Sequence, residues 1–326
     1  MRIITIHRNC SALLALILLS WSVASGEPAH AEDDARLQKR ITELEAENQA
    51  LRKILGGIQN ALKSVPKSTF PASPDSQGLR IVIVPGDWGD SGLTDMRKVC
   101  ESAAGTILAN LPGDGFAPIL VERGKASPIT LFRRGEGHEY LVRLNTSNRA
   151  WAQCAFQFAH EFGHIACNYR NVKNPQMWFE ESLCECASLF ALRRMAVEWK
   201  TNPPYSNWES YSESLAGYAA NRMKKYEGRK DSMAYFYKQH QKELEKTATN
   251  RDLNGFVAVK LLPLLEKSPA AWQTLRYLNL GDPKENRSLA DYLSGWHQRV
   301  PKTHKEFVQS VAAEFQIEFS STSTDD

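Results

Sequence analysis

The sequence lacks an excess of charge of one sign. Its 326 residues include 40 Lys and Arg against 37 Asp and Glu, so the net charge is only +3. The basic residues are scattered along the chain, whereas nucleic-acid-binding proteins concentrate them in a patch. We therefore expect no nucleic-acid partner. The sequence also has no glycine-rich phosphate loop, which argues against a nucleotide-binding enzyme.

Long apolar runs are absent too, and none is long enough for a comfortable membrane span. The best run, Leu13–Leu19, follows a basic start at residues 2–8 and precedes a small-x-small site at residues 29–31. This order is typical of a secretory signal peptide. We predict that residues 1–31 are a signal peptide and that the protein is secreted or periplasmic. Cleavage after residues 23–25 and an uncleaved anchor are the alternatives.

Cysteine is sparse, with six in the sequence. Cys10 lies in the predicted signal, so five would remain after cleavage: Cys100, Cys154, Cys167, Cys184 and Cys186. An exported protein can form disulfides, and an odd number leaves one thiol over. Cys167 could reach Cys184 or Cys186 if the helices that carry them pack together. The alternative is that all five are small buried apolar residues.

The strongest functional pattern is His160-Glu161-Phe162-Gly163-His164. Positions four apart on a helix share a face, so both imidazoles can bind one metal ion. A catalytic Zn²⁺ needs one further protein ligand and an open position for water. Glu161 would lie beside that water and could accept its proton as a general base. We predict a helix over residues 149–168; the alternative is an amphipathic helix with two solvated histidines.

A second helix is predicted just downstream. Asn174 and Pro175 are typical of an N-cap and a first helical position. Residues 176–190 follow as a largely apolar stretch in which Glu181 and Glu185 share one face. If the two helices pack together, one carboxylate would complete the metal shell. The other would bond a ligand histidine and fix its tautomer. A solvated helix face is the alternative.

These two motifs together resemble the gluzincin metallopeptidases, such as thermolysin and the aminopeptidase N family. The second motif reads Trp178-Phe179-Glu180-Glu181-Ser182-Leu183-Cys184-Glu185, and the resemblance covers residues 151–195. It implies that His160, His164 and Glu181 are zinc ligands. It also implies that Glu161 is the general base and that Glu185 orients the first ligand histidine.

Some positions depart from the family pattern or compete with the implied ligands. Ser182 replaces the usual glycine and Cys186 the usual aromatic residue, and neither change removes a ligand. Glu180 is a rival to Glu181, but it points about 100° away on a helix. Cys167 is one turn too far along to converge with both histidines. The glycine and histidine that extend the motif in metzincins are replaced by Cys167 and Arg170.

Residues 34–63 carry a seven-residue repeat that predicts a coiled coil. Its core positions are Leu37, Leu44, Leu51 and Ile58 in one register and Ile41, Asn48, Leu55 and Leu62 in the other. The single polar core residue, Asn48, favours a parallel dimer. Arg40 would face Glu45 of an identical partner, and residues 47 and 52 would pair likewise. We expect a homodimer; the alternative is a helix packed on the catalytic domain.

The rest of the chain predicts one α+β domain of zincin-like layout at residues 79–320, after a Pro/Ser-rich linker at 64–78. A β-rich run at 79–86 and a helix at 94–110 are expected first. Strands near 117–122, 129–133 and 139–145 should precede the active helix, and the chain from 175 should be nearly all helical. In zincins an extended peptide binds along a sheet edge. The strand at 140–145 is our candidate for that edge; a plain structural strand is the alternative.

We therefore expect an exported zinc-dependent peptidase. Tyr211, Tyr218 and His240 are candidates for the group that stabilises the oxyanion, and the sequence does not choose among them. One alternative is a non-catalytic adaptor with a gluzincin-like fold displayed by the coiled coil. Another is a zinc hydrolase of a non-peptide bond, because a metal shell does not encode the substrate. The native substrate and the choice between endo- and exo-cleavage are not determined by the sequence.

Overall fold

The computed structural model describes residues 30–64, 78–111 and 115–319. These residues fall into two units, helix α2 (His30–Ser64) in the first and the chain from residue 78 onward in the second. The predicted signal peptide lies almost wholly outside the described residues, as does most of the predicted linker. None of the helices described has both the length and the apolar character needed to cross a membrane.

Helix α2 contains the whole segment predicted to form a coiled coil. Four of its large apolar side chains remain exposed in the single chain: Leu37 at 60%, Ile41 and Leu44 at 46%, and Leu51 at 58%. All four are core positions of the seven-residue repeat. The repeat therefore forms an uncovered apolar stripe along one helix.

The second unit is an α+β arrangement, which confirms the predicted fold class at that level. Its strands are β1 (Ile81–Ile83), β2 (Ile119–Arg123), β3 (Ile129–Thr130) and β4 (Tyr140–Leu144). Its α-helices are α3 (Leu93–Leu108), α4 (Trp151–Ala166), α5 (Met177–Glu198), α6 (Tyr211–Lys224), α7 (Met233–Lys246), α8 (Arg251–Lys267), α9 (Leu289–Arg299) and α10 (Lys305–Glu314). Short 3-10 helices connect the C-terminal ones at Ser206–Trp208, Pro269–Tyr277, Pro283–Glu285 and Lys302–His304.

The four described strands form one mixed sheet in the order β1-β2-β4-β3. The first three in that order are parallel, and β3 runs antiparallel to β4. The prediction that residues 140–145 form the sheet edge is therefore wrong, because β4 lies between β2 and β3. The edge strand that contacts α4 is β3 instead. It has only two residues, too few for a periodic sequence pattern to identify it as an edge.

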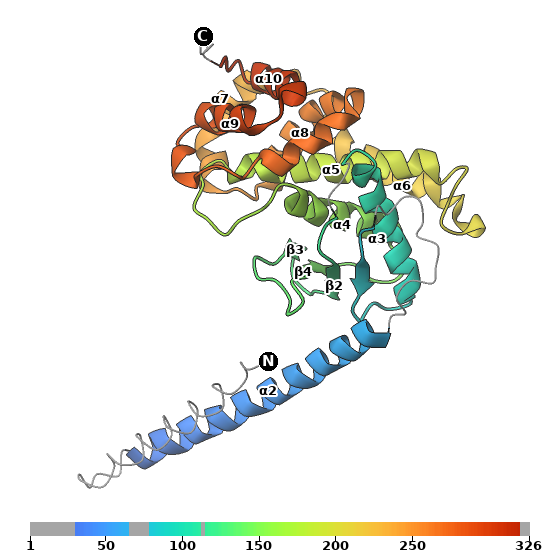
Figure 1. Ribbon diagram of the computed structural model, residues 1–326, viewed down its shortest axis with the longest axis vertical. Coiled ribbons are helices and arrows are strands. Elements are labelled where there is room, and N and C mark those ends of the chain that lie inside the picture. The colour runs from blue at the N-terminus through green and yellow to red at the C-terminus, as the bar shows by residue number, and fades with distance from the viewer. Residues whose placement is uncertain (1–29, 65–77, 112–114, 320–326) are drawn as a thin grey trace, which may run out of the picture. The chain divides into compact units, whose positions relative to one another are not determined.

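Helices α4 and α5 lie at the centre of this unit, as Figure 1 shows. The sheet and α3 cover α4 on one side, and the C-terminal helices α7 to α10 lie beyond α5 on the other. Helix α5 is buried over most of its surface, including its polar Glu180, Ser182 and Ser188. Most of its buried side chains are apolar, as expected for a helix in such a central position. Aromatic side chains from the C-terminal part pack around Phe179 at its start, with ring centroids 6.0–6.1 Å away for Tyr292, Trp296 and Phe315.

Helix α5 begins two residues later than the sequence predicts. Gln176 is its N-cap, whereas the side chain of Asn174 accepts a hydrogen bond from the Gln176 N–H at 2.9 Å. Asn174 therefore stabilises the turn that precedes the helix. Asn side chains commonly accept a hydrogen bond from the backbone N–H two residues ahead in this way.

The two central helices are in close contact at Gly163. A Cβ atom added there would lie 3.0 Å from Cys184 Sγ and 3.1 Å from Cys184 Cα. The second contact is with backbone, which a side-chain rotation cannot relieve. The glycine of the His160–His164 motif therefore sets how near the facing carboxylates of α5 come to the two histidines.

This crossing predicts a position-dependent effect of one substitution. Gly163→Ala and Gly217→Ala both gain helix propensity, but an added Cβ at Gly217 in α6 has open space around it. The difference between the two variants in free energy of unfolding therefore measures the cost of the steric clash at Gly163. Overpacking of this kind costs about 1–3 kcal/mol. We expect Gly163→Ala to unfold at lower urea concentration than Gly217→Ala. Equal midpoints would contradict the close crossing.

Candidate metal centre

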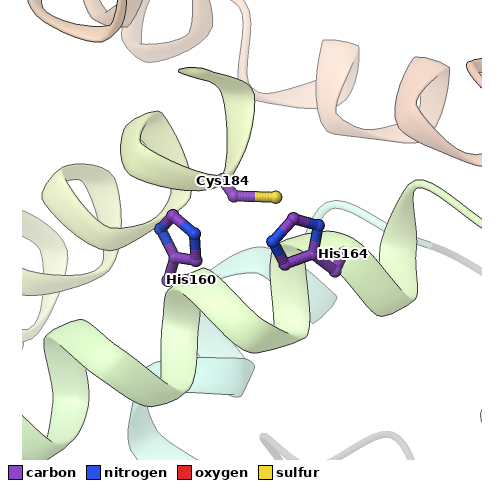
Figure 2. A group of neighbouring side chains, drawn as sticks. All are labelled: His160, His164 and Cys184. Atoms are coloured by element: carbon purple, nitrogen blue, oxygen red, sulfur yellow. The ribbon is translucent and has the colours of Figure 1, made fainter. Parts of the chain in front are cut away.

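The two motif histidines point from successive turns of α4 toward α5 (Figure 2). Their ring centroids are 5.2 Å apart, and their planes are inclined at 70°. The side chains of His160 and His164 are 20% and 14% exposed. A catalytic metal site needs this combination of enclosure and access, because one position must stay reachable from solvent.

Both Nε2 atoms face the carboxylate of Glu181. His160 Nε2 lies 3.3 Å from Glu181 Oε2, and His164 Nε2 lies 3.7 Å from Glu181 Oε1. The structure thus brings together the three residues predicted to be metal ligands. They come from two helices, and their donor atoms meet on the side of α4 that faces α5.

Both Nδ1 atoms face other carboxylates of the same helix. His164 Nδ1 is 2.6 Å from Glu180 Oε1, and His160 Nδ1 is 3.7 Å from Glu185 Oε2. An Nδ1–H that donates to a carboxylate leaves the Nε2 lone pair directed at Glu181. Glu185 thus lies beside the first histidine, where the resemblance placed it.

Glu180, which was considered as a rival ligand to Glu181, lies beside Nδ1 of His164. Its side chain is fully buried and turned toward the site, although it lies on a different face of α5 from Glu181. Its second oxygen accepts from Asn279 Nδ2 at 2.6 Å, and Asn279 Oδ1 accepts from the Tyr292 hydroxyl at 2.8 Å. The two helices lie so close that two neighbouring residues of α5 contact the same imidazole. Glu180 faces Nδ1 of His164, and Glu181 faces Nε2. Only the adjacency of Glu180 to Glu181 hinted at this in the sequence.

Glu161 is held in place by the edge strand. The Thr130 hydroxyl of β3 lies 2.9 Å from Glu161 Oε2 and 3.1 Å from the Glu161 carbonyl oxygen. Both residues are buried, with Glu161 only 2% exposed. The carboxylate that was predicted to be the base therefore has a fixed orientation. No local pattern in the sequence pointed to Thr130, which is 31 residues earlier.

The carboxylates of the site favour the charged form of the imidazoles. Burial lowers the pKa of His160, but its hydrogen bonds with Glu181 and Glu185 and the charge of Glu161 outweigh this and raise the pKa to about 10. Burial acts to raise the pKa of Glu181, while His160, His164 and Arg251 lower it below its usual value. The carboxylates of this site stabilise positive charge at the imidazoles, and a metal ion would experience the same field.

Two guanidinium groups lie near the site. Arg222 donates to Glu185 Oε1 at 3.1 Å, and the charge of Arg251 lowers the pKa of Glu181. Each guanidinium offsets part of the negative charge of the carboxylates that face the imidazoles.

A thiol offers a second possible ligand set. Donor atoms of His160, His164 and Cys184 all lie within 4.8 Å of one another. Figure 2 shows these three side chains, two from α4 and one from α5. Burial raises the pKa of the Cys184 thiol well above its usual value, and nearby Cys167, Glu180 and Glu181 raise it further. Because a thiol must lose its proton to bind zinc strongly, Glu181 is the better prepared ligand.

The two departures from the gluzincin pattern have simple packing roles. The Ser182 hydroxyl donates to the Trp178 carbonyl oxygen at 2.9 Å, so this buried polar group is satisfied within its own helix. Cys186 Sγ contacts the Ala258 carbonyl oxygen of α8 at 3.2 Å. Neither residue makes room for, or takes the place of, a predicted ligand.

The three candidates for the oxyanion group each contact different residues of the domain. The Tyr211 hydroxyl bonds the first turn of α4 through Ala152 N at 3.3 Å. Tyr218 packs on Phe156 and His240 packs on Phe236, with ring centroids 5.6 and 4.6 Å apart. These contacts do not single out one of them. Arg251, which sequence reasoning missed, acts on Glu181 and donates to Ser127 Oγ at 3.2 Å.

Comparisons of the chain with protein-family models, curated proteins and solved structures found no match.

Proposed function

We propose that this chain is an exported zinc-dependent peptidase with a zincin-like domain of gluzincin type. The observation that carries the proposal is the orientation of the two motif histidines. Both Nε2 atoms face Glu181, while each Nδ1 atom faces a separate carboxylate, Glu185 or Glu180. An amphipathic helix with two solvated histidines has no reason to adopt this arrangement. The predicted export signal supports the proposed secreted or periplasmic location.

The donor set fits zinc. Two imidazole nitrogens and one carboxylate are the protein ligands of a common type of catalytic zinc site, which keeps a fourth position for water. His160, His164 and Glu181 would hold the ion. Glu180 and Glu185 would hold the imidazoles in the tautomer that binds it.

The chemistry follows from the residues around that ion. When bound, zinc supplies a Lewis acid that polarises a scissile carbonyl and lowers the pKa of its water. Glu161 accepts a proton from the attacking water and passes it to the leaving amine. The Thr130 hydroxyl holds Glu161 Oε2 at 2.9 Å and so limits the rotation of this carboxylate. Orientation of this kind is what makes general-base catalysis efficient.

The edge strand β3 is the proposed binding site for an extended peptide. Leu131 N donates to Leu141 O of β4 at 2.8 Å, and Ile129 pairs with Arg143. Backbone groups alternate between the two sides of an antiparallel strand, so those of Thr130 point away from β4. A peptide added there by β-augmentation would pass the same residue that holds Glu161.

The non-catalytic adaptor is less well supported because a binding module has no need of an oriented Glu161. Hydrolysis of a non-peptide bond uses the same metal shell and is separated from peptidase activity only by the substrate. Digestion of a peptide library, with and without a zinc chelator, tests all three functions. We expect cleavage that the chelator abolishes and added zinc restores. A zinc-loaded protein that leaves every peptide intact would contradict the peptidase assignment.

We also propose that helix α2 forms a parallel homodimer. Its exposed core residues, such as Leu37 and Leu51, need a partner surface of matching repeat. An identical helix supplies one, because Asn48 meets its own copy and oppositely charged residues face each other across the core. In the single chain Arg40 bonds Glu43 of its own helix at 3.1 Å. This exposed pair contributes little and is easily exchanged for a contact with the partner.

The dimer predicts a difference between two chain lengths. The full chain is expected to have the mass of a dimer in light scattering, and a chain that begins at Gly78 that of a monomer. Both should cleave peptide equally well per site, because every residue of the proposed metal centre lies after Gly78. Asn48→Leu should shift the full chain toward higher oligomers, since the buried amide specifies two strands. One mass class for both chain lengths would refute the coiled-coil dimer.

A further inference from the structure

A chain of three hydrogen bonds connects helix α9 to His164. The Tyr292 hydroxyl donates to Asn279 Oδ1 at 2.8 Å, and Asn279 Nδ2 donates to Glu180 Oε2 at 2.6 Å. The other oxygen of this carboxylate, Glu180 Oε1, lies 2.6 Å from His164 Nδ1. Tyr292, Asn279 and Glu180 are all buried. These four residues form a hydrogen-bond relay that links the C-terminal part of the domain to a proposed zinc ligand.

The amide of Asn279 fits this relay in only one orientation. Its Nδ2 group donates to two acceptors, Glu180 Oε2 at 2.6 Å and the Cys167 carbonyl oxygen at 3.0 Å. A flipped amide would direct its oxygen at both of these acceptors, and a buried polar group that loses its partner is costly. The amide oxygen therefore faces Tyr292, whose hydroxyl supplies the hydrogen that it accepts.

Packing holds Tyr292 where it donates to the amide. Its ring meets that of Phe179 at the start of α5 edge to face, with centroids 6.1 Å apart. Burial and the charge of Glu180 raise the pKa of Tyr292 well above its usual value, so the hydroxyl keeps its hydrogen. The donor at the far end of the relay is therefore fixed in both position and chemical form.

The direction of the relay determines which nitrogen of His164 carries a hydrogen. A carboxylate accepts hydrogen bonds on both oxygens and donates none. Because Glu180 Oε2 accepts from Asn279, Oε1 is left to accept from His164 Nδ1. The lone pair of His164 then belongs to Nε2, which lies 3.7 Å from Glu181 Oε1 and on the side where the ion would bind.

The other motif histidine has a looser partner. His160 Nδ1 lies 3.7 Å from Glu185 Oε2, and the second oxygen of Glu185 accepts from Arg222, whose side chain is 38% exposed. This arrangement includes no member of the relay. The two imidazoles therefore offer a comparison within one molecule, because a change in the relay should affect His164 and spare His160.

We propose that Asn279 and Tyr292 are positioning residues of the proposed metal centre, and that they keep Nε2 of His164 free to bind the ion. Tyr292 sets the orientation of the Asn279 amide, and this amide holds Glu180 so that it accepts from His164. A buried network in which every member has its partner makes such an orientation specific. The inference rests on the proposed zinc site, but the hydrogen bonds that carry it do not require zinc.

Tyr292→Phe tests the relay with a small change, because it removes the hydroxyl and keeps the ring. The full chain is labelled with nitrogen-15 in histidine alone, and the imidazole signals are assigned with variants that lack one motif histidine or the other. In the zinc-loaded parent we expect a hydrogen on His164 Nδ1 that exchanges slowly with water. In Tyr292→Phe its signal should move upfield and exchange faster, whereas the His160 signal stays in place.

Zinc affinity provides the second measurement, by competition with a chromophoric chelator. Tyr292→Phe should lower it by up to about tenfold, less than the roughly 10–100-fold that is lost when a residue that hydrogen-bonds a ligand is removed. In a protein that already carries Asn279→Ala, Tyr292→Phe should cause no further loss, because the relay is already broken. Tyr237→Phe is the matched control. Its hydroxyl donates to Glu245 Oε1 at 3.4 Å, outside the relay, so neither measurement should change.

The proposal is overturned if Tyr292→Phe leaves either the His164 signal or the zinc affinity unchanged. It is also overturned if His160 changes as much as His164, or if Tyr237→Phe has the same effects. Should Asn279→Ala fail to fold, the comparison of Tyr292→Phe with Tyr237→Phe decides alone. A parent protein that binds no zinc would contradict the proposed function. The imidazole signals of the metal-free proteins would then decide whether the relay orients His164.

Discussion

Glu161→Gln is expected to lower peptide turnover by about 10²–10⁴-fold while zinc content stays near one ion per chain. General-base catalysis contributes about this much, and an amide cannot accept the proton. The substitution keeps the size of the side chain, and its amide group can still bond the Thr130 hydroxyl, which now lies 2.9 Å from Glu161 Oε2. The measurement pairs single-turnover peptide cleavage with metal analysis of the same sample.

Two further variants make this result interpretable. Glu213→Gln changes an exposed residue of α6 in the same way and should leave turnover unaltered. Thr130→Val removes the hydroxyl that orients the base, so it should reduce turnover less than Glu161→Gln does. Equal turnover in Glu161→Gln and the parent would refute the proposed mechanism. Zinc-loaded protein that is inactive both as parent and as variant would favour the adaptor.

The parts of the proposed metal centre that could be predicted from sequence are those set by helix geometry. His160 and His164 are one turn apart on a single helix, and so are Glu181 and Glu185, which makes each pair share a face whatever the fold. Their contact across α4 and α5 required only that the two helices pack together. Close packing is favoured by Gly163, the residue that lies at the crossing.

The parts that could not be predicted depend on contacts between segments distant in sequence. Asn279 reaches Glu180 across 99 positions, and Thr130 reaches Glu161 across 31. No local pattern marks either residue. The same limit explains why the edge strand of the sheet was predicted wrongly. Sequence periodicity identifies β4 as a strand but does not identify the strands that pair with it. The crossover that places β4 inside the order β1-β2-β4-β3 is a tertiary property.

Glu181→Ala is expected to have the largest effect on metal binding. It removes one of three proposed protein ligands of the zinc ion. Zinc affinity should therefore fall by more than the roughly 10–100-fold that is lost when a residue that hydrogen-bonds a ligand is removed. Glu185→Ala and Glu180→Ala should each lower zinc affinity by an amount within that smaller range. Zinc affinity is measured by competition with a chromophoric chelator, and zinc content after dialysis confirms the order.

Glu180→Ala has a second consequence that separates it from Glu185→Ala. Glu180 is fully buried, and its loss leaves the Asn279 amide, now 2.6 Å from Glu180 Oε2, without that acceptor. A buried donor that loses its partner costs about 1–3 kcal/mol. The metal-free Glu180→Ala protein should therefore be less stable to urea than metal-free Glu185→Ala, whose other partner, Arg222, is partly exposed.

Cys184→Ala decides between the two possible ligand sets. If Glu181 is the third ligand, removing this thiol should leave zinc affinity within a few-fold of the parent, although the nearby crossing of α4 and α5 loses some packing. If the site were His160, His164 and Cys184, the order would reverse, and Cys184→Ala would lose zinc while Glu181→Ala kept it. We expect the first order, because Glu181 is held in its charged form by the imidazoles, whereas burial keeps the Cys184 thiol protonated by raising its pKa.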